Sequence, residues 1–260
     1  WPLQQSDAFK EMFNVVIQLG AILAVVVLYW SKLWPFHRKR IPQRSWFAQQ
    51  STNGFVGSLQ RFGDRYCCMD KIVMWLKIAV SCLPAMLIGL PLNDWLDKHF
   101  YNPTVVALML LLYGVGFLLV ERYNHRRKPR VNSIAALRWS DALLIGVFQV
   151  LALIPGTSRS GATILGGILI GASREVAAEY TFFLAVPVMF GASLLKIVKF
   201  GAISGTELGV LLVGMAVAFG VSILAIRFLM GYIRKHDFTA FGWYRIGLGL
   251  LVLLYFYVIR

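Results

Sequence analysis

Charged residues are scarce in this sequence, at 15% of its 260 residues, whereas hydrophobic residues make up 58%. A single soluble core of this length could not bury so much apolar surface, which excludes an ordinary water-soluble globular protein. Cysteine and histidine are also rare. The three cysteines, Cys67, Cys68 and Cys82, lack the spacing of a metal site, and the four histidines lie in or beside predicted loops. We therefore assign the cysteines no function and find no membrane-embedded histidine site in the sequence.

Acidic residues are outnumbered, with 12 Asp and Glu against 26 Lys and Arg, for a net charge of +14. In a soluble protein this excess would indicate a nucleic-acid partner. Here the basic residues fall between apolar runs, where cytoplasmic loops of membrane proteins concentrate them. We therefore expect a lipid bilayer as partner, with no nucleic acid, and a site compatible with anionic lipid phosphates.

Six segments are apolar and long enough to cross a bilayer core of roughly 30 Å. They run approximately over residues Met12–Trp30, Ile72–Leu90, Thr104–Val120, Tyr180–Ile197, Leu208–Met230 and Phe241–Val258. The sequence therefore predicts an all-α polytopic membrane protein with six transmembrane helices.

A different pattern occupies about residues 141–172, between the third and fourth spans. Asp141–Ile154 and Ala162–Ala172 are apolar but too short to cross, and the stretch Pro155–Gly161 between them is polar and rich in helix breakers. Two half-length helices around such a turn predict a re-entrant hairpin, since irregular backbone at membrane depth must lie inside protein or beside water.

The charge distribution supports this topology. The loops over residues 31–71 and 121–140 are strongly basic and should be cytoplasmic, whereas the loop Pro91–Pro103 carries Asp94 and Asp97 and should lie outside. The basic loop at Arg234 and Lys235 falls on the cytoplasmic side only if the hairpin is re-entrant.

An internal repeat is also predicted. Val15–Val27 (VVIQLGAILAVVV) and Phe183–Leu195 (FLAVPVMFGASLL) are spans with central small residues, and each precedes two further spans. Three spans per half give the halves opposite orientation, which is the inverted-topology plan. We expect one membrane domain over residues 1–260, with repeat halves 1–130 and 131–260, and a counterpart hairpin in the natural protein N-terminal to Trp1.

The polar turn has the features of an anion site. Gly156 and Gly161 permit close backbone approach, and Thr157, Ser158, Ser160 and Thr163 offer hydroxyl groups at the start of a helix. Arg159 adds a guanidinium that stays charged and binds phosphate in a bidentate way. The alternative is a seam of small residues packed between helices, with Arg159 paired to a carboxylate or carbonyl.

The residues of this turn and its surroundings resemble a known family. The runs PGTSRSGAT from Pro155, IGASREVAAEY from Ile170 with the TFFLAVPVMFGASLL that follows it, FNVVIQLGAILAVV from Phe13, and KHDFTAFGWYRI from Lys235 are similar to undecaprenyl-pyrophosphate phosphatases of the bacitracin-resistance type. The family's glutamate-rich motif ending in Ser-Ser-Thr-Gly-His has no match in this sequence.

The resemblance implies a hydrolase that converts undecaprenyl diphosphate to the monophosphate in the bacterial plasma membrane, recycling the carrier lipid for peptidoglycan synthesis and giving bacitracin resistance. It implies a divalent cation, Mg²⁺ or Ca²⁺. Carried onto this chain, it makes Arg159 the catalytic clamp on the diphosphate. Ser158 is a candidate nucleophile for which we favour an orienting role, and Gly156, Thr157, Ser160, Gly161 and Thr163 form the substrate-binding set.

Other residues carry weaker expectations. Glu11 and Glu179 begin corresponding spans and are candidates either for metal binding or for an interfacial position near a helix N-terminus. Arg174 and Arg245 are interpreted as interfacial anchors or lipid-phosphate contacts. A homodimer is among the expected assemblies. The main rival function is a secondary transporter or polyprenyl-phosphate flippase that uses the same anion site near the membrane midplane.

Overall fold

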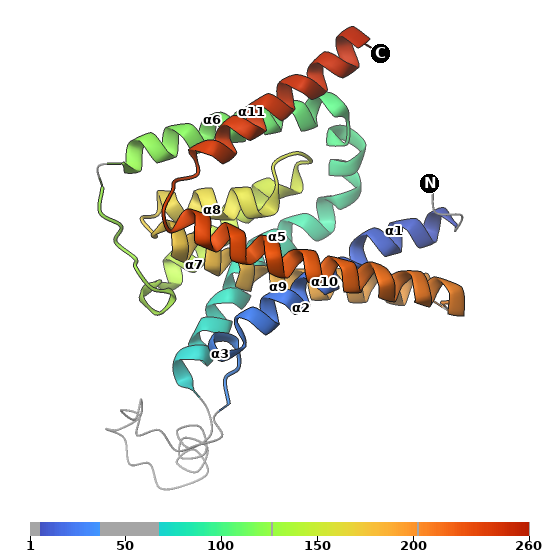
Figure 1. Ribbon diagram of the computed structural model, residues 1–260, viewed down its shortest axis with the longest axis horizontal. Helices are drawn as coiled ribbons and strands as arrows, with labels where there is room; N and C mark the ends of the chain where they lie inside the picture. The colour runs from blue at the N-terminus through green and yellow to red at the C-terminus, as the bar shows by residue number, and fades with distance from the viewer. Residues whose placement is uncertain (1–5, 37–67, 126, 202, 260) are drawn as a thin grey trace, which may run out of the picture.

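The computed structural model describes residues 6–36, 68–125, 127–201 and 203–259. These residues form helices and connecting turns, and no β-strand occurs among them (Figure 1). The α-helices are α1 (Asp7–Val16), α2 (Gln18–Leu28), α3 (Trp30–Leu33), α5 (Met69–Phe100), α6 (Pro103–Asn124), α7 (Trp139–Val150), α8 (Arg159–Leu169), α9 (Arg174–Phe200), α10 (Gly205–Ile233) and α11 (Thr239–Leu254). Short turns of other helix types are η1 (Ile134–Ala136), η2 (Leu151–Leu153) and η3 (Tyr255–Ile259).

Six helical segments have the length and hydropathy of membrane spans, which confirms the predicted number. They cover Ala8–Leu28, Met69–Gly89, Pro103–Asn124, Arg174–Phe200, Gly205–Ile233 and Thr239–Val258. The fourth span begins at Arg174, earlier than expected, because the Ser173 side chain accepts a hydrogen bond from the Val176 amide and caps the helix there. The chain is a multi-pass membrane protein of the predicted all-α class.

Contacts between helices that are distant in the sequence define two ends of the bundle. At one end, which we call the basic end, Lys32 after α2 pairs with Glu179 near the start of α9 at 2.5 Å. At the opposite end, Thr104 on α6 contacts the hydroxyl of Tyr257 beyond α11 at 2.8 Å. The first span therefore ends where the fourth begins, and the third begins where the sixth ends, as spans that alternate in direction require.

The hairpin α7–η2–α8 begins and ends at the basic end. Arg130 contacts both of its arms: the guanidinium pairs with Asp141 near the start of α7 at 2.6 Å and donates to the Ile170 carbonyl after α8 at 3.2 Å. Val131 and Ala172 form an isolated parallel bridge beside these contacts. Because both arms meet one connecting segment, the chain enters and leaves on the same side, as the short apolar arms predicted.

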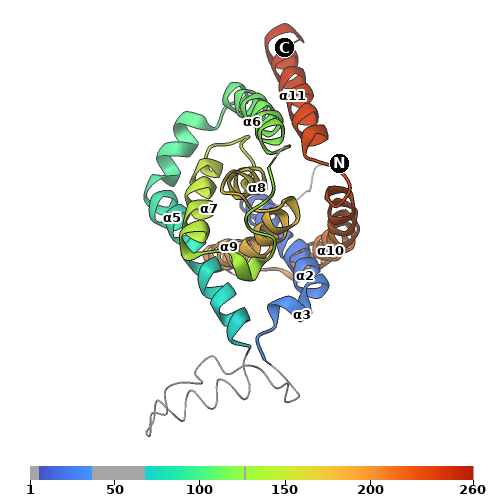
Figure 2. The same ribbon diagram turned by 90° about the vertical axis from the view of Figure 1, so that its left-hand side faces the viewer.

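Helices α8 and α9 lie in the middle of the molecule, with α5, α6, α10 and α2 arranged around them (Figure 2). The first half of α9 is almost fully buried, and Phe183 and Tyr180 are among the most buried large side chains. Tyr180 shares a 2.7 Å hydrogen bond with Ser81 of α5, and Ser81 donates to the Ala142 carbonyl of α7 at 2.6 Å. Polar contacts thus hold the hairpin between α5 and α9.

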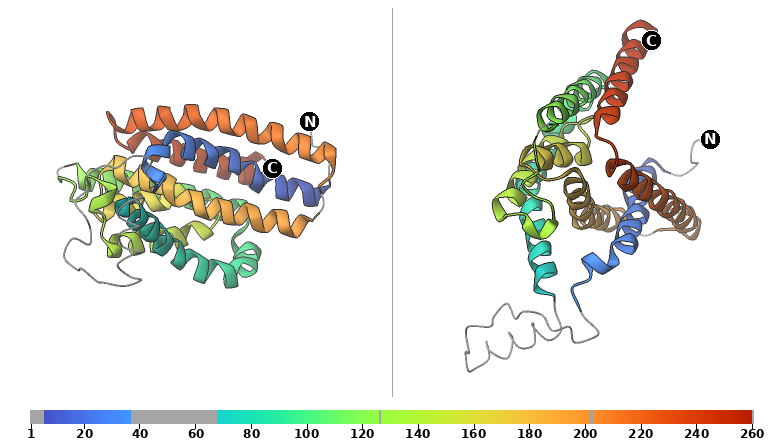
Figure 3. Two further views of the ribbon diagram at one scale, coloured as in Figure 1. Left: turned by 90° about the horizontal axis from the view of Figure 1, so that it is seen from below. Right: turned by 60° about the vertical axis from the view of Figure 1, so that its left-hand side comes forward.

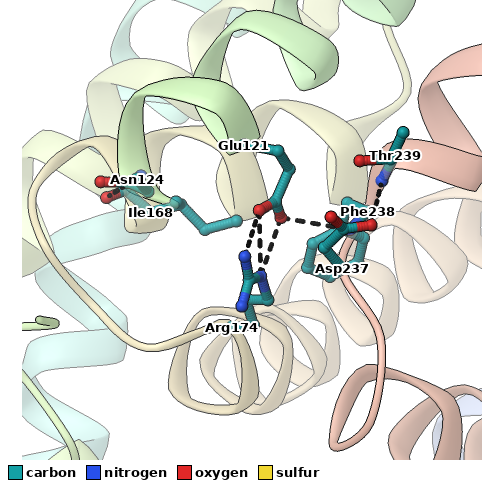
Figure 4. Close-up of polar contacts among 7 residues, drawn as sticks. All are labelled: Glu121, Asn124, Ile168, Arg174, Asp237, Phe238 and Thr239. Carbon is teal, nitrogen blue, oxygen red and sulfur yellow. Dashed lines mark hydrogen bonds and ion pairs between the residues drawn. The ribbon is translucent and has the colours of Figure 1, made fainter. Parts of the chain in front are cut away.

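A buried carboxylate joins three elements at the basic end. Glu121, near the end of α6, accepts hydrogen bonds from the Arg174 guanidinium at the start of α9 and from the Phe238 amide before α11 (Figure 4). Arg174 is therefore an internal partner of Glu121, which corrects its interpretation as a lipid anchor. The views in Figure 3 show how α10 and α11 extend along the outside of the bundle from this region.

The inverted repeat and its halves, 1–130 and 131–260, remain predictions. The basic residues expected in the first cytoplasmic loop, Arg38, Lys39, Arg40, Arg44, Arg61 and Arg65, lie outside the described residues, as does Cys67.

Candidate functional site

The turn between η2 and α8 has an unusual backbone. Gly156 has φ +92°, and Ser158 has φ +65°, which is the one positive φ of a non-glycine residue in the described part of the chain. A side chain at Gly156 would place its Cβ 2.5 Å from the Val106 carbonyl oxygen of α6, so only glycine fits. The left-handed backbone at Ser158 costs about 1–3 kcal/mol, a strain that is typical of functional sites.

Ser158 is the N-cap of α8, and its hydroxyl accepts a hydrogen bond from the Gly161 amide at 3.4 Å. Its Oγ also lies 3.2 Å from the Oγ of Ser160, and both side chains are exposed. The first amides of α8 therefore point into a turn that carries two accessible hydroxyl groups, at the positive end of the helix dipole. This arrangement suits an anion.

Arg159 opens α8 and is partly buried. Its guanidinium makes no hydrogen bond or ion pair with any described residue, although Cys82 of α5 is near enough to interact with it electrostatically. A desolvated guanidinium without a partner costs several kcal/mol. The geometry therefore disfavours the alternative in which Arg159 pairs internally with a carboxylate, and it leaves the cation free for an anionic ligand.

Arg245 of α11 reaches the same turn. Its Nη1 donates to the Thr157 carbonyl at 3.0 Å, and its guanidinium lies over the Phe117 ring at 5.6 Å. A Cβ at Gly161 would lie 2.7 Å from Nη2, so glycine there makes room for the arginine. The interpretation of Arg245 as an interfacial anchor is therefore wrong: it is a second cation at the predicted anion site.

The remaining threonines of the turn face the protein. Thr157 is fully buried, and its Oγ1 has no hydrogen-bond partner among the described residues. Thr163 is also buried: its hydroxyl donates to the Arg159 carbonyl at 3.0 Å and accepts from Thr181 of α9 at 2.9 Å. The structure therefore gives the Thr163 hydroxyl protein partners, while its role toward a ligand remains a prediction.

The turn lies past the middle of the neighbouring helix. Gly156 packs against Val106, near the start of α6 and eighteen residues before Asn124 at the basic end. At about 1.5 Å per residue, that contact is roughly 27 Å from the basic end. Arg245, which also contacts the turn, lies over the ring of Phe117, nearer the middle of α6. The turn therefore extends from the middle of the bundle toward the end opposite the basic loops.

Comparison with known protein families gives a match over most of the chain. The family model described as Bacitracin resistance protein BacA matches residues 1–251. The chain belongs to the BacA family. This confirms the resemblance seen in the motifs around Pro155, Phe13 and Lys235.

Among curated relatives, a protein of Acetivibrio thermocellus named undecaprenyl-diphosphatase is 55% identical over 257 residues, covering 98% of this chain and 86% of the relative. Proteins with the same name from Enterococcus faecalis and Lactococcus lactis subsp. lactis are 52% and 54% identical, covering 97% of this chain in both cases and 84% and 85% of the relatives. None of these relatives is named as a transporter, so the comparisons do not favour the rival function.

Likeness to the BacA family implies a divalent cation. In the described residues, no group of three or more His, Cys, Asp or Glu side chains comes together to bind one. Glu179 pairs with Lys32, and Glu11 lies 3.4 Å from Lys196. Lys196 is seventeen residues after Glu179 on α9, so the two carboxylates lie at opposite ends of a stretch of roughly 25 Å. Glu11 and Glu179 therefore cannot bind one metal together.

Sequence reasoning missed Arg245 because its position near the start of a span is also that of an interfacial anchor. One signal was available: a lone arginine inside an apolar helix is costly unless it has a partner or a function. The partner, the Thr157 carbonyl, is 88 residues away in the sequence.

Proposed function

We propose that this protein dephosphorylates undecaprenyl diphosphate to undecaprenyl monophosphate in the bacterial plasma membrane. Membership of the BacA family and relatives that are named undecaprenyl-diphosphatase and are 50–55% identical support the reaction. The observation in the structure that carries the proposal is the Arg159 guanidinium at the start of α8, which has no hydrogen bond or ion pair among the described residues, while Arg245 contacts the same turn at Thr157.

Each group of the turn has a task in this proposal. Arg159 holds the terminal phosphoryl group and stabilises the charge that develops on its oxygens, while the first amides of α8 hold further oxygens. Ser158 and Ser160, whose hydroxyls are exposed, orient the diphosphate. Arg245 acts differently, because its hydrogen bond to Thr157 fixes the turn while its charge adds to the positive potential there.

These groups supply binding and charge stabilisation. In the described part of the chain, the hydrogen bonds of the turn involve hydroxyl, amide, carbonyl and guanidinium groups, and none involves a carboxylate or imidazole. A positioned donor of this kind is worth about 10²–10³ in rate, and an arginine on a transferred phosphoryl group about 10³–10⁵. We therefore assign the turn the phosphate clamp and derive no proton transfer from it.

The direction of substrate entry follows from the depth of the turn. The distribution of Lys and Arg predicts that the basic loops are cytoplasmic, so the basic end, with Lys32, Arg130 and Arg234, would be the inner end. Since Gly156 lies near the opposite end of α6, the diphosphate reaches Arg159 from the outer side of the membrane. The polyprenyl chain then stays in the surrounding lipid, where the exposed apolar side chains of the helices also lie.

The divalent metal ion remains a prediction. Mg²⁺ or Ca²⁺ would neutralise diphosphate charge when bound, and we derive no step through it because the described residues contain no ligand set. Its requirement is measured by phosphate release after chelation and after each ion is restored.

The test uses the full-length protein in detergent with a polyprenyl diphosphate, and it measures release of inorganic phosphate. We expect release by the parent protein, loss on Arg159→Ala, and normal release on Arg122→Ala, which removes an exposed arginine of α6 away from the turn. In parallel, vesicles that contain the protein are tested for movement of the lipid between leaflets. Lipid movement without phosphate release would reject the phosphatase in favour of the flippase.

A further inference from the structure

A second polar region lies away from the Arg159 turn. A cavity of about 1000 Å³ opens at the basic end, between the start of α5, the segment that follows α6, and the connection from α8 to α9. Leu169 and Gly171 line it, and Leu169 is at the far end of α8 from Arg159. Eleven helical residues separate the cavity from the Arg159 turn by roughly 16 Å. A ligand in the cavity would therefore not occupy the proposed phosphatase site.

The cavity is strongly basic. Seven Lys and Arg residues line it, against three Asp and Glu residues. Most of these cations already have partners: Lys32 pairs with Glu179, Arg130 with Asp141, Arg174 with Glu121, and Arg234 approaches Glu175 at 3.7 Å. Lys71 donates to two backbone carbonyls. The cations that remain free for a ligand are therefore few and can be identified.

Arg127 and Lys128 are those cations. Both side chains are exposed, and neither makes an ion pair with a carboxylate in the described part of the chain. The Arg127 guanidinium lies 3.9 Å from the centre of the Tyr123 ring, which holds it at the cavity wall by a cation–π contact. The start of α9, a helix of 27 residues, also lines the cavity and adds the positive end of its dipole.

The inner wall of the cavity is apolar. Ile134, Leu169 and Ile170 line it and keep accessible apolar surface, whereas Met74, Ile168, Phe183 and Ile233 lie buried behind them. A basic rim above an apolar wall matches a molecule with a phosphate at one end and a hydrocarbon chain at the other. Basic pockets between transmembrane helices on the cytoplasmic side bind anionic lipid headgroups in this way.

We propose that this cavity binds the phosphate-bearing headgroup of an anionic lipid from the adjoining leaflet. Arg127 and Lys128 contact the phosphate, and the part of the lipid nearest the headgroup lies against Leu169 and Ile170. The site does not depend on the proposed phosphatase activity, because it shares no residue with the Arg159 turn.

The test measures lipid binding to the full-length protein in a zwitterionic detergent, by native mass spectrometry, with phosphatidylglycerol as probe and phosphatidylcholine as the neutral comparison. The cavity variant carries Arg127→Gln and Lys128→Gln. The matched control carries Arg122→Gln and Lys235→Gln, which remove the same charge from exposed residues at the same end but outside the cavity.

We expect the cavity variant to bind phosphatidylglycerol about tenfold or more weakly, since each basic residue near an anionic headgroup contributes on the order of fivefold in affinity. The control should change less than about twofold by the same reasoning, because its residues do not line the cavity. Phosphate release measured without anionic lipid should be the same in all three proteins. Thermal unfolding checks that each is folded, and the single variants Arg127→Gln and Lys128→Gln replace the double variant if it is not.

Equal weakening in the cavity variant and the control would overturn the proposal, because it would show attraction to the whole basic end. Saturable binding of inorganic phosphate alone that is lost in the cavity variant, without binding of phosphatidylglycerol, would also overturn it and assign the cavity to a free anion.

Discussion

Replacing Arg159 with glutamine tests whether this arginine binds the ligand or stabilises the fold. The Arg159 guanidinium is partly buried and makes no hydrogen bond or ion pair with a described residue, so the fold gains nothing from its charge. Removing an unpaired, desolvated cation leaves stability unchanged or raises it. Arg245→Gln, in contrast, breaks the bond to the Thr157 carbonyl, and a hydrogen bond from a charged group is worth about 1.5–3 kcal/mol.

The effect on catalysis should run the other way. Arg159→Gln removes the guanidinium that holds the terminal phosphoryl group, so kcat for phosphate release should fall by at least about 10²–10³, equal to roughly 3–4 kcal/mol of transition-state stabilisation. Arg245→Gln should lower both activity and stability, because the turn loses a contact that positions it.

The assay combines phosphate release with thermal unfolding of the full-length protein in the same detergent. Arg122→Gln serves as control, since this exposed arginine of α6 lies away from the turn. The reasoning is refuted if Arg159→Gln unfolds at a clearly lower temperature than the parent protein, or if it keeps more than about a tenth of the parental kcat, a loss below that expected for a phosphate clamp.

Three further variants test other contacts. Gly161→Ala should displace Arg245, because the new Cβ would lie 2.7 Å from Nη2; like Arg245→Gln, it should lower both kcat and stability, and unchanged kinetics would contradict the packing. Glu121→Gln leaves the partly exposed Arg174 without its carboxylate and should cost about 1.5–3 kcal/mol in unfolding experiments, whereas a stability equal to the parent's would show that the Glu121–Arg174 pair is dispensable. Thr163→Val removes a hydroxyl with protein partners only, so it should lower stability by about 1–3 kcal/mol while KM stays within about twofold; a large rise in KM would instead support direct substrate binding.

Predictions from local sequence held where the physical cause is itself local. A run of about 20 apolar residues can be satisfied in lipid only as a helix, so the six spans followed from hydropathy and length. The hairpin followed from two arms too short to cross, and the turn followed from the breakers between Pro155 and Gly161. The family was recognisable because its motifs are contiguous in the chain.

The predicted start of the fourth span was less accurate, because a helix cap sets it. Polar and charged residues at Ser173, Arg174 and Glu175 argued against a span before Tyr180, yet the helix begins at Arg174. The cap and the buried partner of Arg174, the Glu121 carboxylate, stabilise this extra turn and a half. A hydropathy window does not register either contact.

The sequence by itself determined the class of protein, the number of spans, the re-entrant hairpin and the family, because these depend on hydropathy, length and contiguous motifs. Only the tertiary structure decided which polar groups meet. It brought Arg245 to Thr157, turned Thr163 toward Thr181, separated Glu11 from Glu179, and left Arg159 without a hydrogen-bond or ion-pair partner among the residues that the structure describes. Such contacts join residues on different helices, and their geometry is set by how those helices pack. The same packing carries the turn past the middle of α6, where Gly156 meets Val106.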